Sequence, residues 1–142
     1  MFPTSHFHPM LVHFPIALVV IGFLAESASY FIKKEICLTK VGFYLLIVGT
    51  LSALFAWLTG LLFTSEMSGS AGKIRETHEL LAWITLGLLL LTSVLRIVIQ
   101  TREKLSQNFK WLSFILYALS AVSVSVTGFL GGNLVYNYMM PL

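Results

Sequence analysis

The chain has 142 residues, of which 57% are hydrophobic and 11% are charged, and its formal net charge is +3. An ordinary soluble domain carries about 25% charged residues, so this composition predicts one polytopic membrane domain over residues 1–142. The nine Lys and Arg residues are spread over short segments. They form no basic stripe with interleaved aromatics, which excludes nucleic acid as an expected partner.

Four apolar segments are predicted to be helices, and none of them forms a convincing internal repeat with another. Each has about 20 residues or more, enough to cross a hydrocarbon core of about 30 Å. Helices joined by short connections pack as antiparallel neighbours. The predicted fold is therefore all-α, a transmembrane antiparallel four-helix bundle whose helices cover residues 10–32, 41–63, 78–99 and 111–136.

The basic residues predict the orientation of this bundle. The second connection holds only Lys73 and Arg75, whereas seven basic residues flank the first and third connections: Lys33, Lys34, Lys40, Arg96, Arg102, Lys104 and Lys110. Short loops that are rich in Lys and Arg stay in the cytoplasm. We therefore expect a multi-pass protein of the cytoplasmic membrane, in contact with the lipid bilayer, with both termini on the extracytoplasmic side.

The first apolar segment opens on HPMLVHFP, which contains His8 and His13. Pro15 lacks a backbone N–H, so the sequence predicts either a helix that begins at Pro15 or a helix that is kinked there. In both cases His13 lies just inside the membrane boundary, where an unpaired imidazole is costly. His13 is therefore the stronger candidate for a ligand, and His8 is an alternative or supporting residue.

The third apolar segment begins with a histidine, His78, at about the depth of His13. Two such imidazoles on facing helices can act as axial ligands of haem. Lys73 and Arg75 lie nearby, where they could pair with haem propionates. Neutralisation of neighbouring glutamates is an equally good explanation of these two bases.

The fourth apolar segment is rich in small residues. Gly128, Gly131 and Gly132 could make room for a flat macrocycle, although small residues also let membrane helices pack closely. In the same bundle, Glu26 lies at a depth from which Arg96 could be reached. A structural ion pair and a role in proton handling both remain open for them.

A mononuclear metal site competes for the same histidines. Zinc usually takes four tetrahedral ligands, or three with one open position, and the candidates are His8, His13, His78 and Glu79, with His13 and His78 at the centre. Acid–base and nucleophilic catalysis have little support, because the chain contains no Asp and no Gly-x-Ser-x-Gly elbow. An electron-transfer or binding protein is expected rather than a catalyst.

Three stretches carry a resemblance that covers nearly the whole chain: HPMLVHFPI from His8, HELL from His78 and GGNLVY from Gly131. With them the chain resembles a bacterial integral-membrane domain family of unknown function. The resemblance implies a four-helix domain of the bacterial inner membrane. Members can be joined to Rieske iron–sulfur or cytochrome c domains, and this implies electron transfer at the outer face.

These observations together predict a small membrane protein that binds b-type haem between the first and third helices, near the extracytoplasmic face. His13 and His78 would be the axial ligands, and a quinone or an extracytoplasmic redox protein would be the partner. The alternative is a structural or Zn/Cu-binding membrane subunit of a larger complex. A homo-oligomer is compatible with either function.

Overall fold

A computed structural model of the chain describes residues 7–32, 36–64, 66–102 and 106–138. The regular elements of these residues are the helices α1 (Phe7–Leu11), α2 (His13–Phe31), α3 (Ile36–Phe63), α4 (Gly69–Thr101) and α5 (Gln107–Asn137). Four stretches are long and apolar enough to cross a membrane: His8–Phe31, Cys37–Phe63, Gly69–Thr101 and Gln107–Asn137. The prediction of an all-α membrane protein with four spans is confirmed.

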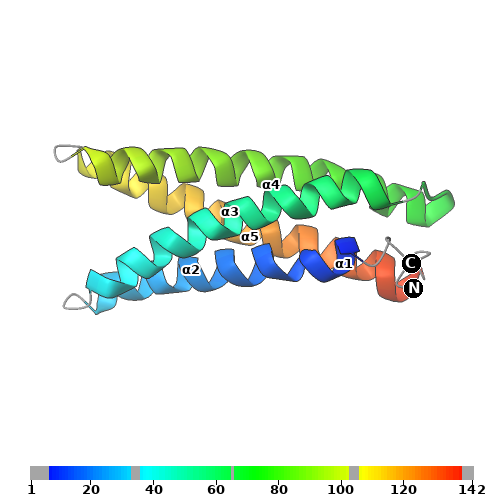
Figure 1. Ribbon diagram of the computed structural model, residues 1–142, viewed down its shortest axis with the longest axis horizontal. Coiled ribbons are helices and arrows are strands. Elements are labelled where there is room, and N and C mark those ends of the chain that lie inside the picture. Colours follow the sequence, from blue (N-terminus) through cyan, green and yellow to red (C-terminus); the bar gives the residue numbers. More distant parts are fainter. Residues whose placement is uncertain (1–6, 33–35, 65, 103–105, 139–142) are drawn as a thin grey trace.

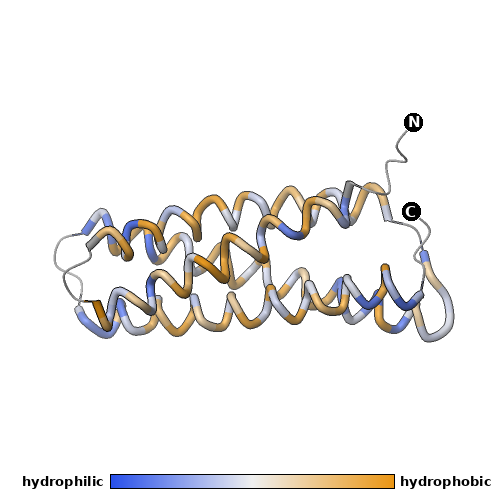
Figure 2. The backbone as a smooth tube through the Cα atoms, turned by 90° about the horizontal axis from the view of Figure 1, so that it is seen from below, coloured by the Kyte–Doolittle hydropathy of each residue, from blue (hydrophilic) through white to orange (hydrophobic). Residues whose placement is uncertain are grey.

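The four long helices lie lengthwise in one bundle. Figure 1 shows the chain running away from α1 along α2 and α4 and returning along α3 and α5. Figure 2 shows hydrophobic residues along the length of each helix and hydrophilic residues gathered toward the two ends. The closest packing is within the hairpins α2–α3 and α4–α5, and the bundle is closed by the pairs α2–α5 and α3–α4.

The first span is interrupted near its start. Val12 separates α1 from α2, while Pro9 lies inside α1 and Pro15 is the third residue of α2. A proline is tolerated in the first turn of a helix, where its missing N–H would have no partner inside the helix. Pro15 therefore marks the beginning of the regular helix α2 and does not kink its interior.

Helix α4 is longer than the sequence predicts, since it begins at Gly69 and not near His78. Gly69 has a φ of 68°, in the left-handed region that glycine adopts without a steric penalty. Gly72 approaches the backbone of Met67 so closely that an added Cβ would lie 2.6 Å from the Met67 oxygen. These two glycines allow a tight connection from α3, and they place His78 two turns inside its helix.

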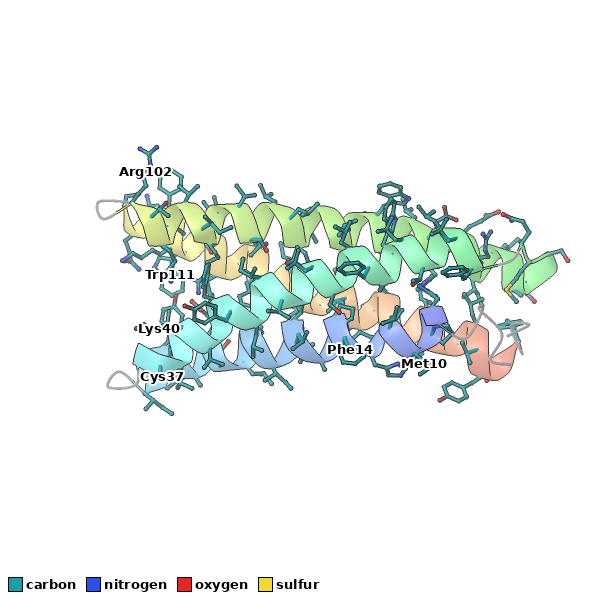
Figure 3. The ribbon with its side chains drawn as sticks, in the orientation of Figure 1. Met10, Phe14, Cys37, Lys40, Arg102 and Trp111 are labelled. Atoms are coloured by element: carbon teal, nitrogen blue, oxygen red, sulfur yellow. The ribbon has the colours of Figure 1, made fainter. Side chains whose placement is uncertain are left out.

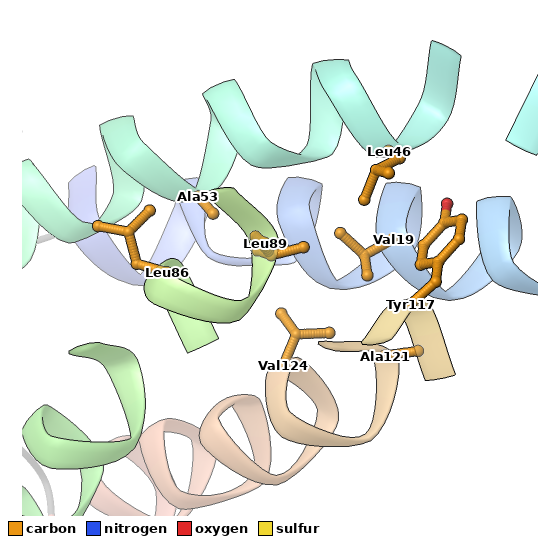
Figure 4. Packing of buried hydrophobic residues seen from close by; sticks show 8 residues of the cluster. All are labelled: Val19, Leu46, Ala53, Leu86, Leu89, Tyr117, Ala121 and Val124. Atoms are coloured by element: carbon orange, nitrogen blue, oxygen red, sulfur yellow. The ribbon is translucent and has the colours of Figure 1, made fainter. Parts of the chain in front are cut away.

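The core lies in the middle of the bundle (Figure 4). Val19, Leu46, Leu89 and Tyr117, one from each long helix, are fully buried there. A hydroxyl pair joins α3 to α4 in the same region, with 2.8 Å between Thr50 Oγ1 and Ser93 Oγ. Hydrogen bonds between side chains of this kind help membrane helices to associate.

The two ends of the bundle differ in composition. Figure 3 shows Lys40 and Arg102 near one end and Met10 toward the other. We call these ends the basic end and the histidine end, because His8 and His78 both lie at the latter. The orientation was predicted from seven basic residues that flank the first and third connections. Three of them lie outside the described residues: Lys33, Lys34 and Lys104.

Candidate ligand site between two histidines

His8 lies in α1 and is half-buried against α3. Its Nδ1 is 2.9 Å from the backbone oxygen of Ala56 and 3.2 Å from Thr59 Oγ1. A carbonyl oxygen only accepts hydrogen bonds, so Nδ1 carries the proton and donates. The ring packs on Gly60, where an added Cβ would lie 3.0 Å from His8 Cε1.

His78 lies in α4 and has the same arrangement against α5. Its Nδ1 is 3.0 Å from the backbone oxygen of Thr127, to which it donates. Beneath the ring lies Gly131, where an added Cβ would be 3.1 Å from His78 Cε1. Both imidazoles are therefore oriented by a backbone carbonyl and seated on a glycine one turn further along the same helix.

The two rings meet across the bundle. Their centroids are 6.3 Å apart and their planes make an angle of 76°. Within the described part of the chain, neither ring uses Nε2 in a hydrogen bond. A histidine whose Nδ1–H is held by a carbonyl presents Nε2 as the nitrogen that binds a metal. Each ring is therefore held in one tautomer, with an unprotonated Nε2 that could bind a ligand.

A cavity of about 450 Å³ surrounds the two rings, within the range of about 300–1,000 Å³ that is typical of small-molecule sites. Its wall includes Trp57 of α3, Thr85 of α4 and Gly128 of α5. The Thr85 hydroxyl is already paired with Ser123 and Thr127. The Trp57 Nε1–H, in contrast, is buried and has no hydrogen-bond partner among the described residues.

His13 does not make the expected contact with His78. It lines the outer part of the cavity, but its ring is exposed and its Nδ1 lies 2.8 Å from the backbone oxygen of Pro9. Five residues of helix turn a side chain by about 140°, so His8 and His13 cannot both face the bundle interior. The ring opposite His78 is that of His8, and the prediction of a facing pair formed by His13 and His78 was wrong.

The other predicted site residues are distributed around this cavity. Gly128, Gly131 and Gly132 all line it. Arg75 lies at its rim and forms a 2.8 Å ion pair with Glu66, whereas the exposed Lys73 is not part of the wall. The interpretation that Arg75 neutralises a neighbouring glutamate is thus supported, and a role for either base in ligand binding stays a prediction.

The alternative zinc site, with three or four ligands from His8, His13, His78 and Glu79, is not formed by the described residues. No three His, Cys, Asp or Glu side chains cluster in a way that could hold a metal ion, within the residues that the structure describes. The outward turn of His13 leaves only His8 and His78 in ring contact. A structural zinc site, which needs four protein ligands, is therefore disfavoured.

At the opposite, basic end, Glu26 and Arg96 form a buried ion pair. Of the two roles predicted for these residues, a structural ion pair and proton handling, the structure contains the ion pair. Two neighbouring polar atoms of this end, Arg96 Nε and Ser113 Oγ, are buried without a hydrogen-bond partner in the described residues. The ion pair crosses from α2 to α4, so it ties together the same two long segments that carry the histidines.

Two elements of the site are not identifiable from sequence reasoning alone. Gly60 belongs to a stripe of small residues that is equally typical of helix packing, and Trp57 follows no recognisable motif. Gly60 lies one helical turn after Ala56, whose carbonyl oxygen accepts a hydrogen bond from His8. This hydrogen bond would identify Gly60 as part of the site, but the sequence alone does not reveal it.

Comparisons with known proteins identify the family. The model of a family described as "Predicted membrane protein (DUF2231)" matches residues 4–141, and the chain belongs to this family. No curated protein and no solved structure matches the chain.

Proposed function

For this member of a family of predicted membrane proteins, we propose that the cavity binds b-type haem, with His8 and His78 as axial ligands, and that the protein transfers electrons. The observation that carries the proposal is the pair of imidazoles at a centroid distance of 6.3 Å. The two rings are thus close enough for one metal ion to be held between them.

The local chemistry of the two rings supports the same proposal. Each Nδ1–H is held by a backbone carbonyl, which orients the ring and raises the basicity of the other nitrogen toward a metal. Gly60 and Gly131 replace side chains that would otherwise crowd the imidazoles. When bound, the haem would supply one-electron chemistry, while the protein sets its potential through the axial ligands and the surrounding dielectric.

One basic residue, Arg75, lines the cavity together with Glu66 and Glu79, and Arg75 could pair with a carboxylate of the ligand. Arg75 lies at the rim with a side chain only 20% exposed, while its partner Glu66 is 88% exposed and can turn away into solvent. Arg75 is then free to make a bidentate pair with a propionate.

The expected setting is the bacterial inner membrane, with the histidine end on the extracytoplasmic side. Lys40 and Arg102 near the opposite end (Figure 3) fit a cytoplasmic location for that end. The cavity would then exchange electrons with a quinone from the bilayer or with an extracytoplasmic redox protein. Neither exchange requires a catalytic acid or base.

Absorption spectroscopy tests this function. The protein is produced in a haem-replete host, purified in mild detergent and titrated with added haemin. We expect a low-spin Soret spectrum that His8→Ala and His78→Ala each abolish, whereas His13→Ala retains it and serves as the matched control. A wild-type protein that shows no Soret band after titration would contradict the proposal.

The same samples address the alternative metal site. Metal analysis of colourless protein would detect stoichiometric copper or zinc if the two imidazoles hold an ion without a macrocycle. A spectrum that is lost in His13→Ala and retained in His8→Ala would return the axial role to His13. Either result would overturn the assignment of His8.

A further inference from the structure

The two halves of the chain place matching residues at matching positions. His78 follows His8 by the same interval that separates Arg96 from Glu26, which is 70 residues. Both pairs are in direct contact, one as a ring pair and the other as an ion pair. The first span and α4 therefore run in the same direction and stay in register from one end of the bundle to the other.

Helices α3 and α5 match in the same way, with an interval one residue longer. The backbone oxygen of Ala56 accepts from His8, and that of Thr127 accepts from His78. Gly60 lies beneath the first ring and Gly131 beneath the second. Each histidine is therefore held by the same construction within its own hairpin.

Burial follows the same correspondence through the core. Val19 of α2 and its counterpart Leu89 of α4 are both at 0% exposure. So are Leu46 of α3 and its counterpart Tyr117 of α5. Figure 4 shows these four side chains converging in the middle of the bundle. These two pairs of corresponding positions are thus buried to equal extents, even where the residue types differ.

The packing of whole helices has the symmetry that this correspondence requires. In this correspondence α2 is the counterpart of α4, and α3 is the counterpart of α5. The contact α2–α3 then has α4–α5 as its counterpart, and the contact α2–α5 has α3–α4. All four contacts are present, and they are the main contacts between long helices. Because each hairpin crosses the membrane twice, both halves have the same orientation, and the axis that relates them lies along the bundle.

We propose that the protein consists of two equivalent helical hairpins, residues 7–63 and 69–137, related by a two-fold axis, and that the ligand cavity is a shared site on this axis to which each hairpin contributes one histidine. At a two-fold interface, a residue on the axis meets its own equivalent. His8 meets His78 and Glu26 meets Arg96, so these two contacts mark the axis at its two ends. The shared site rests on the function proposed above, whereas the equivalence of the hairpins does not.

One difference between the halves determines which side of the cavity is open. The position of Trp57 in α3 corresponds to Gly128 in α5, and that of Leu61 corresponds to Gly132. Trp57 packs against Trp83 with ring centroids 4.5 Å apart. On α5, an added Cβ at Gly128 would lie 2.4 Å from Ile16 Cδ1, whereas an added Cβ at Gly132 would meet open space. The body of the ligand therefore lies on the α5 side.

Exchange of the ion pair tests the equivalence without any ligand. Glu26→Arg alone and Arg96→Glu alone each bury two like charges, and we expect the yield of monodisperse protein to fall by about tenfold or more. The double variant E26R/R96E rebuilds the pair between equivalent positions and should return to within about twofold of the wild type. A double variant as poor as the single variants would overturn the equivalence.

Haemin titration of Gly132→Leu tests the open side, because this change gives α5 the side chain that α3 carries at Leu61. We expect normal assembly and at least about tenfold weaker binding, with Gly87→Leu as the control, since an added Cβ there also meets no atom. Unchanged binding in Gly132→Leu would overturn the α5 placement. If haemin fails to bind the wild type, the shared haem site is rejected with the proposed function, while the charge exchange still decides the equivalence.

Discussion

The first span and α4 meet at both ends of the bundle, but their contacts differ: two neutral rings meet at the histidine end and two opposite charges meet at the basic end. At the histidine end, half-buried rings keep one nitrogen each unused and border a cavity. At the basic end, Glu26 and Arg96 neutralise each other with side chains only 3% and 7% exposed. A neutral imidazole tolerates a partly empty site, whereas a buried charge needs its partner at all times. The first end is therefore suited to binding and the second to holding the hairpins together.

The largest effect should come from breaking the ion pair. Arg96→Met leaves the Glu26 carboxylate buried and unpaired, which costs about 3–5 kcal/mol. We expect a large loss of thermal stability in detergent, with an unchanged Soret maximum in the protein that remains folded. Thermal unfolding followed by circular dichroism measures the first effect, and the absorption spectrum measures the second.

The matched control replaces both charges. Glu26→Leu combined with Arg96→Met removes the buried charge altogether, and replacements of this kind are often neutral or stabilising. The double variant should regain most of the stability that Arg96→Met loses. A stable Arg96→Met single variant would show that the basic end does not hold the bundle, and the contrast between the ends would fail.

The fold and its spans were predictable because hydropathy is a local property. Each of the four spans contains a stretch of 18 residues with a mean hydropathy of 1.8–2.1, and this property does not depend on contacts with the rest of the chain. The contact between Glu26 and Arg96 was foreseen as one of two alternatives for the same reason, since their depths follow from counting residues along helices.

The histidine partner was not predictable, because it depends on how the first span is rotated in the bundle. Depth alone favours His13, but His8 and His13 point about 140° apart, and the ring that meets His78 is that of His8. The internal equivalence is hidden for a different reason. His8 and His78 are identical, but Glu26 corresponds to Arg96 and Trp57 to Gly128, so few of the corresponding positions share a residue type.

A smaller effect should follow from crowding either histidine. Gly60→Ala and Gly131→Ala each add a Cβ about 3 Å from a ring carbon, and displacement of the ring weakens the hydrogen bond that orients it. Loss of one such bond costs about 1 kcal/mol, so haemin should bind about fivefold more weakly in each variant. Titration of Gly87→Ala, where an added Cβ meets no atom and the residue lies outside the cavity wall, provides the control. Unequal effects of the first two variants would argue against equivalent hairpins.

The smallest effect should come from the layer between the two ends. Thr50→Val removes the hydroxyl that pairs with Ser93 across α3 and α4, and interhelical hydrogen bonds in membranes average about 0.6 kcal/mol. Thr101→Val controls for the substitution, because the exposed Thr101 bonds only to carbonyls of its own helix. We expect Thr50→Val to lower thermal stability slightly more than this control and to leave haemin affinity unchanged. Weaker haemin binding in Thr50→Val would mean that the middle layer transmits packing changes to the histidines, and the two ends would no longer be independent.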